Sequence, residues 1–201
     1  DTGLNTGGMG AVSPVPFANN KFIEKVKKHI IDPTLRGLKK ERIKYVGFVF
    51  FGLINVNEDP YVIEYNVRLG DPESQVVIPR IDSDLLELLL SIESPEEFKN
   101  HSIEISPLNA STIIMSAGGY PETYNTGDTI HGIKKVDNSI VFHAGTLKTK
   151  NDNLITNGGR VLAMTSLENS MQKSISISYK NLKKIDFHGC YYRKDIGKDL
   201  F

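Results

Sequence analysis

The sequence has a single cysteine, Cys190, and no surplus of charge of either sign, with 24 Lys and Arg residues against 24 Asp and Glu residues. One cysteine excludes an intrachain disulfide and a zinc cluster of thiolates, so we expect a reducing, cytoplasmic location. A chain of zero net charge lacks the basic surplus with which nucleic-acid-binding domains usually meet phosphates. We therefore expect no nucleic-acid partner.

Long apolar runs are also missing. The longest uncharged apolar stretch, residues 46–56, is shorter than the roughly 18 residues that a membrane span requires. We therefore expect a soluble protein with no membrane segment. The chain opens at Asp1 without a methionine or a signal sequence, which indicates the interior of a longer protein. Its 39% of hydrophobic residues, together with 17 glycines, is typical of a globular domain.

The first forty residues predict a loop followed by a helix. Residues 1–20 carry turn-forming residues and no hydrophobic period, so they predict a loop. Apolar side chains from Phe22 to Ile30 recur at the spacing of one helix face. Asp32 and Pro33 suit the start of a new turn and predict that this helix bends or restarts there.

A β-hairpin and two short helices are predicted next. Residues 46–56 and 61–67 are short, apolar and rich in β-branched and aromatic residues, and they predict a hairpin at the centre of a sheet. Residues 83–90 predict a leucine-rich helix, and residues 94–97 show the capping-box pattern of a second one.

The pattern changes near residue 105, where a small β-rich unit is predicted to begin. Its predicted strands are residues 111–117, 129–133, 140–144, 160–165 and 186–193. One helix, residues 167–184, is predicted to pack on these strands.

The second strand of the hairpin carries the strongest chemical signal. Because side chains alternate across a strand, Glu64, Asn66 and Arg68 are expected to project from one face, while the residues between them pack on the other. Neighbours on one face lie about 6.6 Å apart, so a carboxylate and an amide oxygen can share Mg²⁺ while a guanidinium meets a phosphoryl group. A solvent-facing strand surface explains the same pattern, and the spacing does not decide between the two.

Two more carboxylates, Asp71 and Glu73, follow this strand directly. Either one can orient or deprotonate an amine nucleophile if it lies within hydrogen-bond distance of the proton. Gly70, Asp71 and Pro72 also form good turn sequence, so the roles of base, anchor and turn stay open at this point.

The glycine-rich segment at residues 5–10 is a second candidate site. Its glycines allow backbone N–H groups to approach an anion closely. The segment has neither the trailing Lys-Ser/Thr of a Walker loop nor a dinucleotide fingerprint, so a loop without a ligand explains it equally well. The five histidines show no metal-ligand spacing, and we interpret them, like Cys190, as structural.

Six segments, taken in order, resemble the phosphoribosylamine-glycine ligase family, the glycinamide ribonucleotide synthetases of purine biosynthesis. The segments are residues 1–10, 64–73, 117–121, 143–146, 157–162 and 192–197. Six ordered segments across nearly the whole chain are far more specific than any one of them. The resemblance implies an α+β fold with two parts. Residues 1–104 would form the C-terminal part of an ATP-grasp domain, an antiparallel sheet with helices, and residues 105–201 a small β-rich C-terminal domain.

The resemblance also implies a reaction and its site. ATP would phosphorylate glycine, and 5-phosphoribosylamine would attack the glycyl phosphate to give glycinamide ribonucleotide, ADP and phosphate. The site residues implied for these steps are Glu64 and Asn66 as ligands of Mg²⁺ or Mn²⁺, Arg68 as the catalytic group facing the phosphoryl group, and Asn5, Thr6, Gly7, Gly8, Asp71 and Glu73 as substrate-binding residues.

The chain departs from the family pattern in what it lacks. Leu4 stands where the family has a proline. Many ATP-grasp enzymes also place an acidic metal ligand on the preceding strand, and the segment 50–54 offers none, as is expected of this family too. The family's N-terminal domain, ATP-holding lysines and lid strand have no counterpart here. We therefore expect the N-terminal half of the enzyme as a partner and no activity from this chain alone. The alternatives are another ATP-grasp enzyme, such as a purine-pathway carboxylase that uses bicarbonate, and a non-catalytic binding module.

Overall fold

The structure, a computed structural model, describes residues 3–201 and divides into two compact units. Unit 1 comprises the segment ending at Ser13, Asp71–Asp84 and Ser102–Phe201, and unit 2 comprises Pro14–Gly70 and Leu85–His101. The mixture of helices and antiparallel sheets confirms the predicted α+β class. The domain division at residues 104 and 105 stays a prediction.

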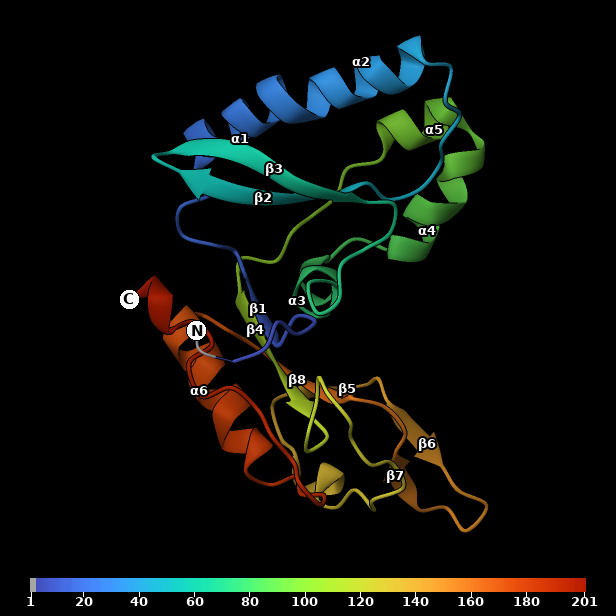
Figure 1. Ribbon diagram of the computed structural model, residues 1–201. Coiled ribbons are helices and arrows are strands. Elements are labelled where there is room, and N and C mark those ends of the chain that lie inside the picture. Colours follow the sequence, from blue (N-terminus) through green and yellow to red (C-terminus); the bar gives the residue numbers. More distant parts are fainter. Residues whose placement is uncertain (1–2) are drawn as a thin grey trace. The chain divides into compact units, whose positions relative to one another are not determined.

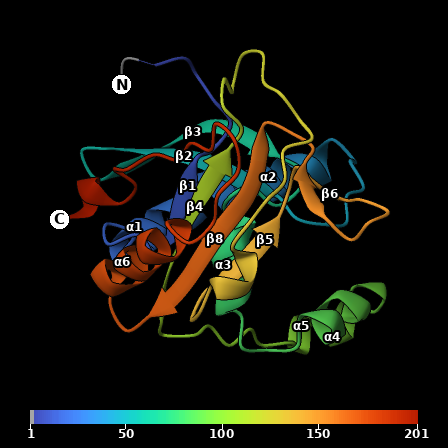
Figure 2. The same ribbon diagram turned by 90° about the horizontal axis from the view of Figure 1, so that it is seen from below.

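Unit 1 is built on a four-stranded antiparallel sheet with the strand order β1-β4-β8-β5 (Figures 1 and 2). The strands are β1 (Gly10–Ser13), β4 (Asn109–Ser116), β5 (Ile140–His143) and β8 (Arg160–Glu168). The two central strands, β4 and β8, are almost wholly buried because both of their faces are covered, which agrees with the continuous apolar runs at residues 113–115 and 161–164.

Strand β1 corrects the prediction of a loop for residues 1–20, of which the first two lie outside the described residues. Gly10 pairs with Ile113 and Ser13 with Ala110 of β4. A four-residue strand that begins with glycine has no local signal of its own. Its conformation depends on a partner about a hundred residues further along the chain.

Helix α6 (Met171–Leu182) packs on β4 and β8 and closes the main hydrophobic core. The helix starts later than predicted because β8 continues to Glu168, and Ser170 then accepts a hydrogen bond from the Lys173 N–H at 3.3 Å. Buried serines form the contact between helix and sheet, with Ser174 Oγ donating to Ser111 Oγ at 2.7 Å.

Two of the predicted strands of unit 1 are wrong. Residues 129–133 and 186–193 make only isolated bridges, between Thr129 and Ile155, His131 and Asp186, and Ser116 and Tyr191. A small hairpin of β6 (Thr146–Lys148) and β7 (Leu154–Thr156) was not predicted, because these strands are three residues long. The remaining elements of this unit are α3 (Ser74–Val77) and the 3₁₀ turns η2 (Ile78–Arg80), η4 (Ile133–Lys135) and η5 (Lys198–Leu200).

Unit 2 begins with one long helical stretch, α1 (Asn20–Val26), the π-helical η1 (Lys27–Ile31) and α2 (Asp32–Lys40). The side chain of Asn19 caps it by accepting the Phe22 N–H at 3.0 Å. A π-helical turn ends at Ile31, and α2 begins at Asp32 with Pro33 in its first turn, which agrees with the predicted restart.

The predicted β-hairpin is confirmed as β2 (Phe50–Val56) and β3 (Asp59–Asn66), with α1 packed on β3 (Figure 1). Asn57 and Glu58 form the turn with φ values of 52° and 66°, as a two-residue hairpin turn requires. The predicted place at the centre of a sheet is wrong, because within residues 3–201 the two strands form a sheet of their own. The apolar residues of a strand indicate that the strand is covered, but they do not identify whether another strand or a helix covers it.

Two short helices complete unit 2 where they were predicted. They are α4 (Leu85–Leu90) and α5 (Pro95–Asn100), separated by η3 (Ser91–Glu93). Ser94 caps α5 by accepting the Glu97 N–H at 3.5 Å. In the part of the chain that the structure describes, no helix combines the length and the apolar character needed to cross a bilayer.

Candidate functional site

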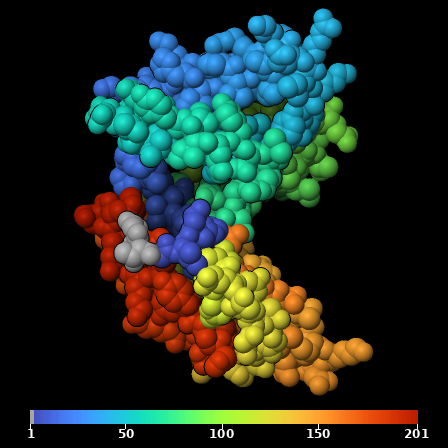
Figure 3. All heavy atoms as spheres, in the orientation of Figure 1, coloured from blue at the N-terminus to red at the C-terminus, as the bar shows by residue number. Residues whose placement is uncertain are grey.

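Glu64 and Asn66 lie side by side on one face of the hairpin in unit 2. The Asn66 Nδ2 group donates a hydrogen bond to Oε1 of Glu64 at 2.8 Å. Gly52 stands directly opposite Glu64 on β2, and a Cβ added there would lie 2.7 Å from Cγ of Glu64. The absence of a side chain at Gly52 therefore gives the Glu64 carboxylate its room. The teal hairpin residues are visible at the surface in the space-filling view (Figure 3).

The other face of β3 differs from the sequence prediction. Tyr65 does turn to that face, where its ring contacts Phe51 at 5.4 Å between centroids. Ile63, however, is left unpaired at a bulge, since Gly52 pairs with Glu64 and Leu53 with Val62. Ile63 and Val67 are 67% and 70% exposed, so the prediction that they pack is wrong within the described chain.

Arg68 lies beyond the end of β3, which stops at Asn66. Its Nη1 group donates to the carbonyl of Leu69 at 3.0 Å, and its side chain is exposed. The strand alternation that places Glu64 and Asn66 on one face therefore does not extend to Arg68.

The chemistry of the Glu64 and Asn66 pair fits a hard divalent cation. Because the amide nitrogen of Asn66 is used by Glu64, its Oδ1 and the second carboxylate oxygen of Glu64 remain as ligands. Residues 3–201 contain no group of three or more His, Cys, Asp and Glu side chains that could hold a metal ion. An ion held by this pair would need further ligands from outside these residues, and phosphates and water are ligands that Mg²⁺ commonly takes.

The glycine-rich loop of residues 5–8 belongs to unit 1 and is bound on two sides. The Gly7 N–H donates to the Tyr120 hydroxyl at 3.1 Å, and the Gly8 carbonyl accepts from Arg160 Nη1 at 3.0 Å. A Cβ added at Gly8 would lie 2.3 Å from Cδ of Pro72. Only glycine permits this close approach, so the loop can pack directly against Pro72.

Asp71 is an anchor in this structure. One carboxylate oxygen accepts from Arg160 Nη2 at 2.8 Å and the other from Gln75 Nε2 at 2.8 Å. Glu73 stands at the start of α3, where its carbonyl accepts the N–H groups of Val76 and Val77. Within residues 3–201 the Glu73 carboxylate itself makes no hydrogen bond. Of the three roles that the sequence left open for Asp71, the geometry favours the anchor.

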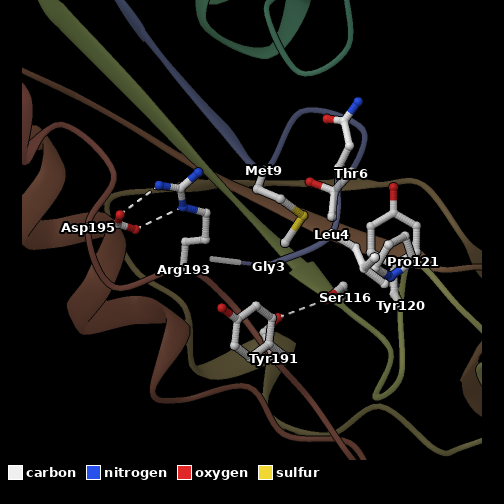
Figure 4. Close-up of a pocket in the computed structure, with 11 residues that line it drawn as sticks. Gly3, Leu4, Thr6, Met9, Ser116, Tyr120, Pro121, Tyr191, Arg193 and Asp195 are labelled. Atoms are coloured by element: carbon white, nitrogen blue, oxygen red, sulfur yellow. Dashed lines mark hydrogen bonds and ion pairs between the residues drawn. The ribbon is translucent and has the colours of Figure 1, made fainter. Parts of the chain in front are cut away.

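A pocket of about 690 Å³ opens beside this loop in unit 1 (Figure 4). Its lining residues are Gly3, Leu4, Asn5, Thr6, Met9, Ser116, Tyr120, Pro121, Tyr191, Arg193 and Asp195. Asn5 and Thr6, two of the predicted substrate residues, thus lie in the wall of the pocket. Gly7 and Gly8 do not line it and are hydrogen-bonded to Tyr120 and Arg160. The volume lies within the usual range of small-molecule sites.

Arg193 brings the positive charge to this pocket. Its Nε and Nη2 groups donate to the two carboxylate oxygens of Asp195 at 2.9 and 2.6 Å (Figure 4). These hydrogen bonds from Arg193 lower the pKa of the Asp195 carboxyl to about 2. Tyr179 of α6 braces the segment by donating to the Arg193 carbonyl at 2.9 Å and accepting the Ile196 N–H at 3.0 Å. The pKa of the Tyr179 hydroxyl is raised, mainly because the side chain is partly buried.

Tyr120, Arg160 and Arg193 are functional candidates that the sequence did not predict. All three lie in segments that carry the family resemblance, which was the available signal. An arginine directly before the apolar run at residues 161–164 of β8 was a second signal.

The sequence matches two domain families in succession. Residues 1–74 match the phosphoribosylglycinamide synthetase ATP-grasp (A) domain, and residues 110–199 match the phosphoribosylglycinamide synthetase C domain. These two matches include every predicted site residue from Asn5 to Glu73, as well as Tyr120, Arg160 and Arg193.

Curated relatives with these domains extend well beyond this chain. A phosphoribosylamine-glycine ligase of Fusobacterium nucleatum is 44% identical over 98% of this chain and 47% of its own length. A bifunctional purine biosynthetic protein of Pichia angusta, PUR2,5, is 41% identical over 100% of this chain and 26% of its own. The chain therefore spans about half the length of the single-function relative.

Solved structures agree with these matches. The structure of phosphoribosylamine-glycine ligase from Thermotoga maritima superposes with a TM-score of 0.81 at 33% identity, over 97% of this chain and 48% of that one. Biotin carboxylase from Campylobacter jejuni superposes with a TM-score of 0.59 at 14% identity, over 96% of this chain and 44% of that one, which shows a shared fold.

Proposed function

Because this chain belongs to the phosphoribosylglycinamide synthetase family, we propose that it is part of an ATP-dependent ligase that joins glycine to 5-phosphoribosylamine in de novo purine biosynthesis. The products are glycinamide ribonucleotide, ADP and phosphate, with glycyl phosphate as the intermediate. The observation that carries the proposal is the 44% identity to a relative named phosphoribosylamine-glycine ligase over 98% of the chain. The matched region includes both candidate site segments.

Glu64 and Asn66 are the residues that would hold Mg²⁺ or Mn²⁺ with the nucleotide. A bound divalent ion supplies positive charge to the phosphate oxygens. Arg68 is the permanently charged group of this segment and stabilises negative charge on the phosphoryl group during transfer to the glycine carboxylate.

The pocket beside the glycine-rich loop binds the phosphorylated sugar amine. Arg193 uses Nε and Nη2 for Asp195, and within residues 3–201 no group accepts from its Nη1, which can therefore donate to the substrate phosphate. Asn5 and Thr6 offer hydrogen bonds from the same wall.

Glu73 is the carboxylate available for the amine. Asp71 has both oxygens engaged by Arg160 and Gln75, so we assign it the role of holding these side chains in place and not contact with the amine. Glu73 carries no such bonds within the described chain, and we assign it contact with the substrate amine, whose proton it can accept during attack on glycyl phosphate.

The N-terminal half of the enzyme is the partner that completes the nucleotide site. The relatives of single function are about twice as long as this chain, so this assignment is consistent with their lengths. The cytoplasmic location expected from the single cysteine stays a prediction.

ADP release by the full-length enzyme tests the proposal. The assay contains ATP, Mg²⁺, glycine and 5-phosphoribosylamine, and each is omitted in turn. We expect turnover to require all four and to collapse in Glu64→Gln. The matched control is Glu58→Gln, which removes a carboxylate from the exposed turn of the same hairpin and should retain activity.

Other outcomes point to the alternatives. ADP release that needs bicarbonate in place of glycine would identify an ATP-grasp carboxylase. Nucleotide binding without turnover under any combination would identify a binding module.

A further inference from the structure

We propose that Arg160 is a positioning residue that holds the substrate loop of unit 1 in its working conformation. The inference rests on the proposed function for the identity of the substrate, while the loop geometry stands independently of it. Nothing in the family resemblance assigns a role to this side chain.

Arg160 joins two segments that are remote from it in sequence. From the first position of β8, its Nη1 group donates to the carbonyls of Gly8 and Asp71, both at 3.0 Å. Its Nη2 group donates to the Asp71 carboxylate at 2.8 Å. The partners are 152 and 89 residues away along the chain. One side chain thus connects the glycine-rich loop to the segment that follows Gly70.

The contact set requires the shape of a guanidinium. Three acceptors are met by two nitrogens of one planar group, a geometry that a lysine ammonium cannot reproduce. The Arg160 side chain is 23% exposed, so water competes only partly for these hydrogen bonds.

The residue next to Arg160 supports the same loop from another direction. A Cβ added at Gly159 would lie 2.3 Å from Cδ2 of Tyr120, so glycine at this position lets the Tyr120 ring approach. The Tyr120 hydroxyl accepts the Gly7 N–H at 3.1 Å. Gly159 and Arg160 therefore act on neighbouring residues of the loop. Gly159 leaves room for the Tyr120 ring, whose hydroxyl binds Gly7, and the Arg160 guanidinium binds Gly8 directly.

The effect on substrate passes through the loop. Asn5, Thr6 and Met9 line the 690 Å³ pocket on either side of the two glycines, and Arg160 does not line it. With the loop fixed in advance, substrate binding need not order it. Losing Arg160 should thus weaken the binding of the substrate in this pocket and leave the rest of unit 1 folded.

Hydrogen exchange of the full-length enzyme tests the positioning without any assay of activity. In Arg160→Ala we expect the Gly7 amide, which donates to the Tyr120 hydroxyl, to exchange at least tenfold faster, with β4 and α6 unchanged. Arg160→Lys, which keeps the charge, should also speed exchange of this amide, and it replaces the alanine variant if that variant fails to fold. The matched control Arg36→Ala removes an exposed arginine from α2 and should change nothing in the loop. Unchanged loop exchange, or faster exchange throughout the sheet, would overturn the proposal.

Steady-state kinetics test the consequence. In Arg160→Ala we expect the KM for 5-phosphoribosylamine to rise at least tenfold while the KM for ATP stays within twofold. Adding Asp71→Asn should cost no more than a further twofold, because both residues act in one contact. Equal rises in both KM values would overturn the substrate part of the inference. If the wild-type enzyme shows no turnover dependent on glycine and the amine, the proposed function fails, and the exchange result alone decides the role of Arg160.

Discussion

Asn66 and Glu64 meet through one hydrogen bond of 2.8 Å, in which the amide nitrogen of Asn66 is the donor. This bond fixes the orientation of the amide, so that its oxygen is left for another ligand. Two neighbouring side chains of one strand thereby present oxygen atoms on the face of the hairpin where Gly52 leaves space. The arrangement gives a direct test of metal binding.

We expect Asn66→Ala to raise the Mg²⁺ concentration that half-saturates ADP release on the order of tenfold, because it removes one ligand oxygen and the hydrogen bond that orients Glu64. A metal titration at saturating ATP measures this shift. Asn55→Ala, on the opposite face of the same hairpin, is the matched control. An unchanged titration curve for Asn66→Ala would remove this residue from the metal site.

Arg68→Lys is expected to lower kcat by roughly tenfold or more and to leave the KM for ATP within a factor of about two. A lysine keeps the charge and loses the bidentate geometry that suits a phosphoryl group in transfer. Steady-state kinetics at varied ATP separate the two parameters. Arg36→Lys on α2 controls for the substitution itself, and identical kinetics for both variants would contradict a catalytic role for Arg68.

Gly8→Ala should disturb the substrate loop, because the new Cβ would lie 2.3 Å from Cδ of Pro72. We expect kcat/KM for 5-phosphoribosylamine to fall by about tenfold or more, which corresponds to roughly 1.4 kcal/mol or more of lost transition-state stabilisation. Gly37→Ala is the control, since a Cβ at Gly37 meets nothing within 4 Å. Wild-type kinetics for Gly8→Ala would show that the loop adapts.

Cys190 should be unreactive in the native protein. Burial, with a smaller contribution from Asp186, raises the pKa of its thiol to about 12. The thiolate is the reactive form, and at pH 8 roughly one thiol in ten thousand is ionised at that pKa. We expect alkylation by iodoacetamide at pH 8 to be at least about 100-fold slower than in guanidinium chloride, where the thiol regains an ordinary pKa near 8.5.

The sign of the pH dependence provides the control for this experiment. Because the native pKa is raised, the native alkylation rate should keep rising as the pH increases from 8 to 10. A rate that levels off near pH 9 would show an ordinary exposed thiol. Cys190 is the single cysteine of these 201 residues, and mapping of the labelled peptide reports on it specifically.

Local patterns in the sequence predicted the elements whose signal is local. The hairpin around Asn57 and Glu58, the capped helix at Ser94 and the buried strand β4 follow from turn residues, caps and apolar runs within a few positions. The pairing of Glu64 with Asn66 followed as well, because a strand places alternate residues on one face. The order of the six motifs identified the family, since order along the chain is a property of the sequence.

The tertiary structure decided whatever depends on a distant partner. Strand β1 exists because β4 pairs with it, and residues 129–133 fail to form a strand because they find only isolated bridges. Asp71 becomes an anchor only when Arg160, 89 residues away, reaches both its carbonyl and its carboxylate. A contact of this kind leaves no periodicity in the sequence. It is set by the register of β8 in the sheet and by the close approach that the nearby glycines allow, and both arise only when the chain is folded.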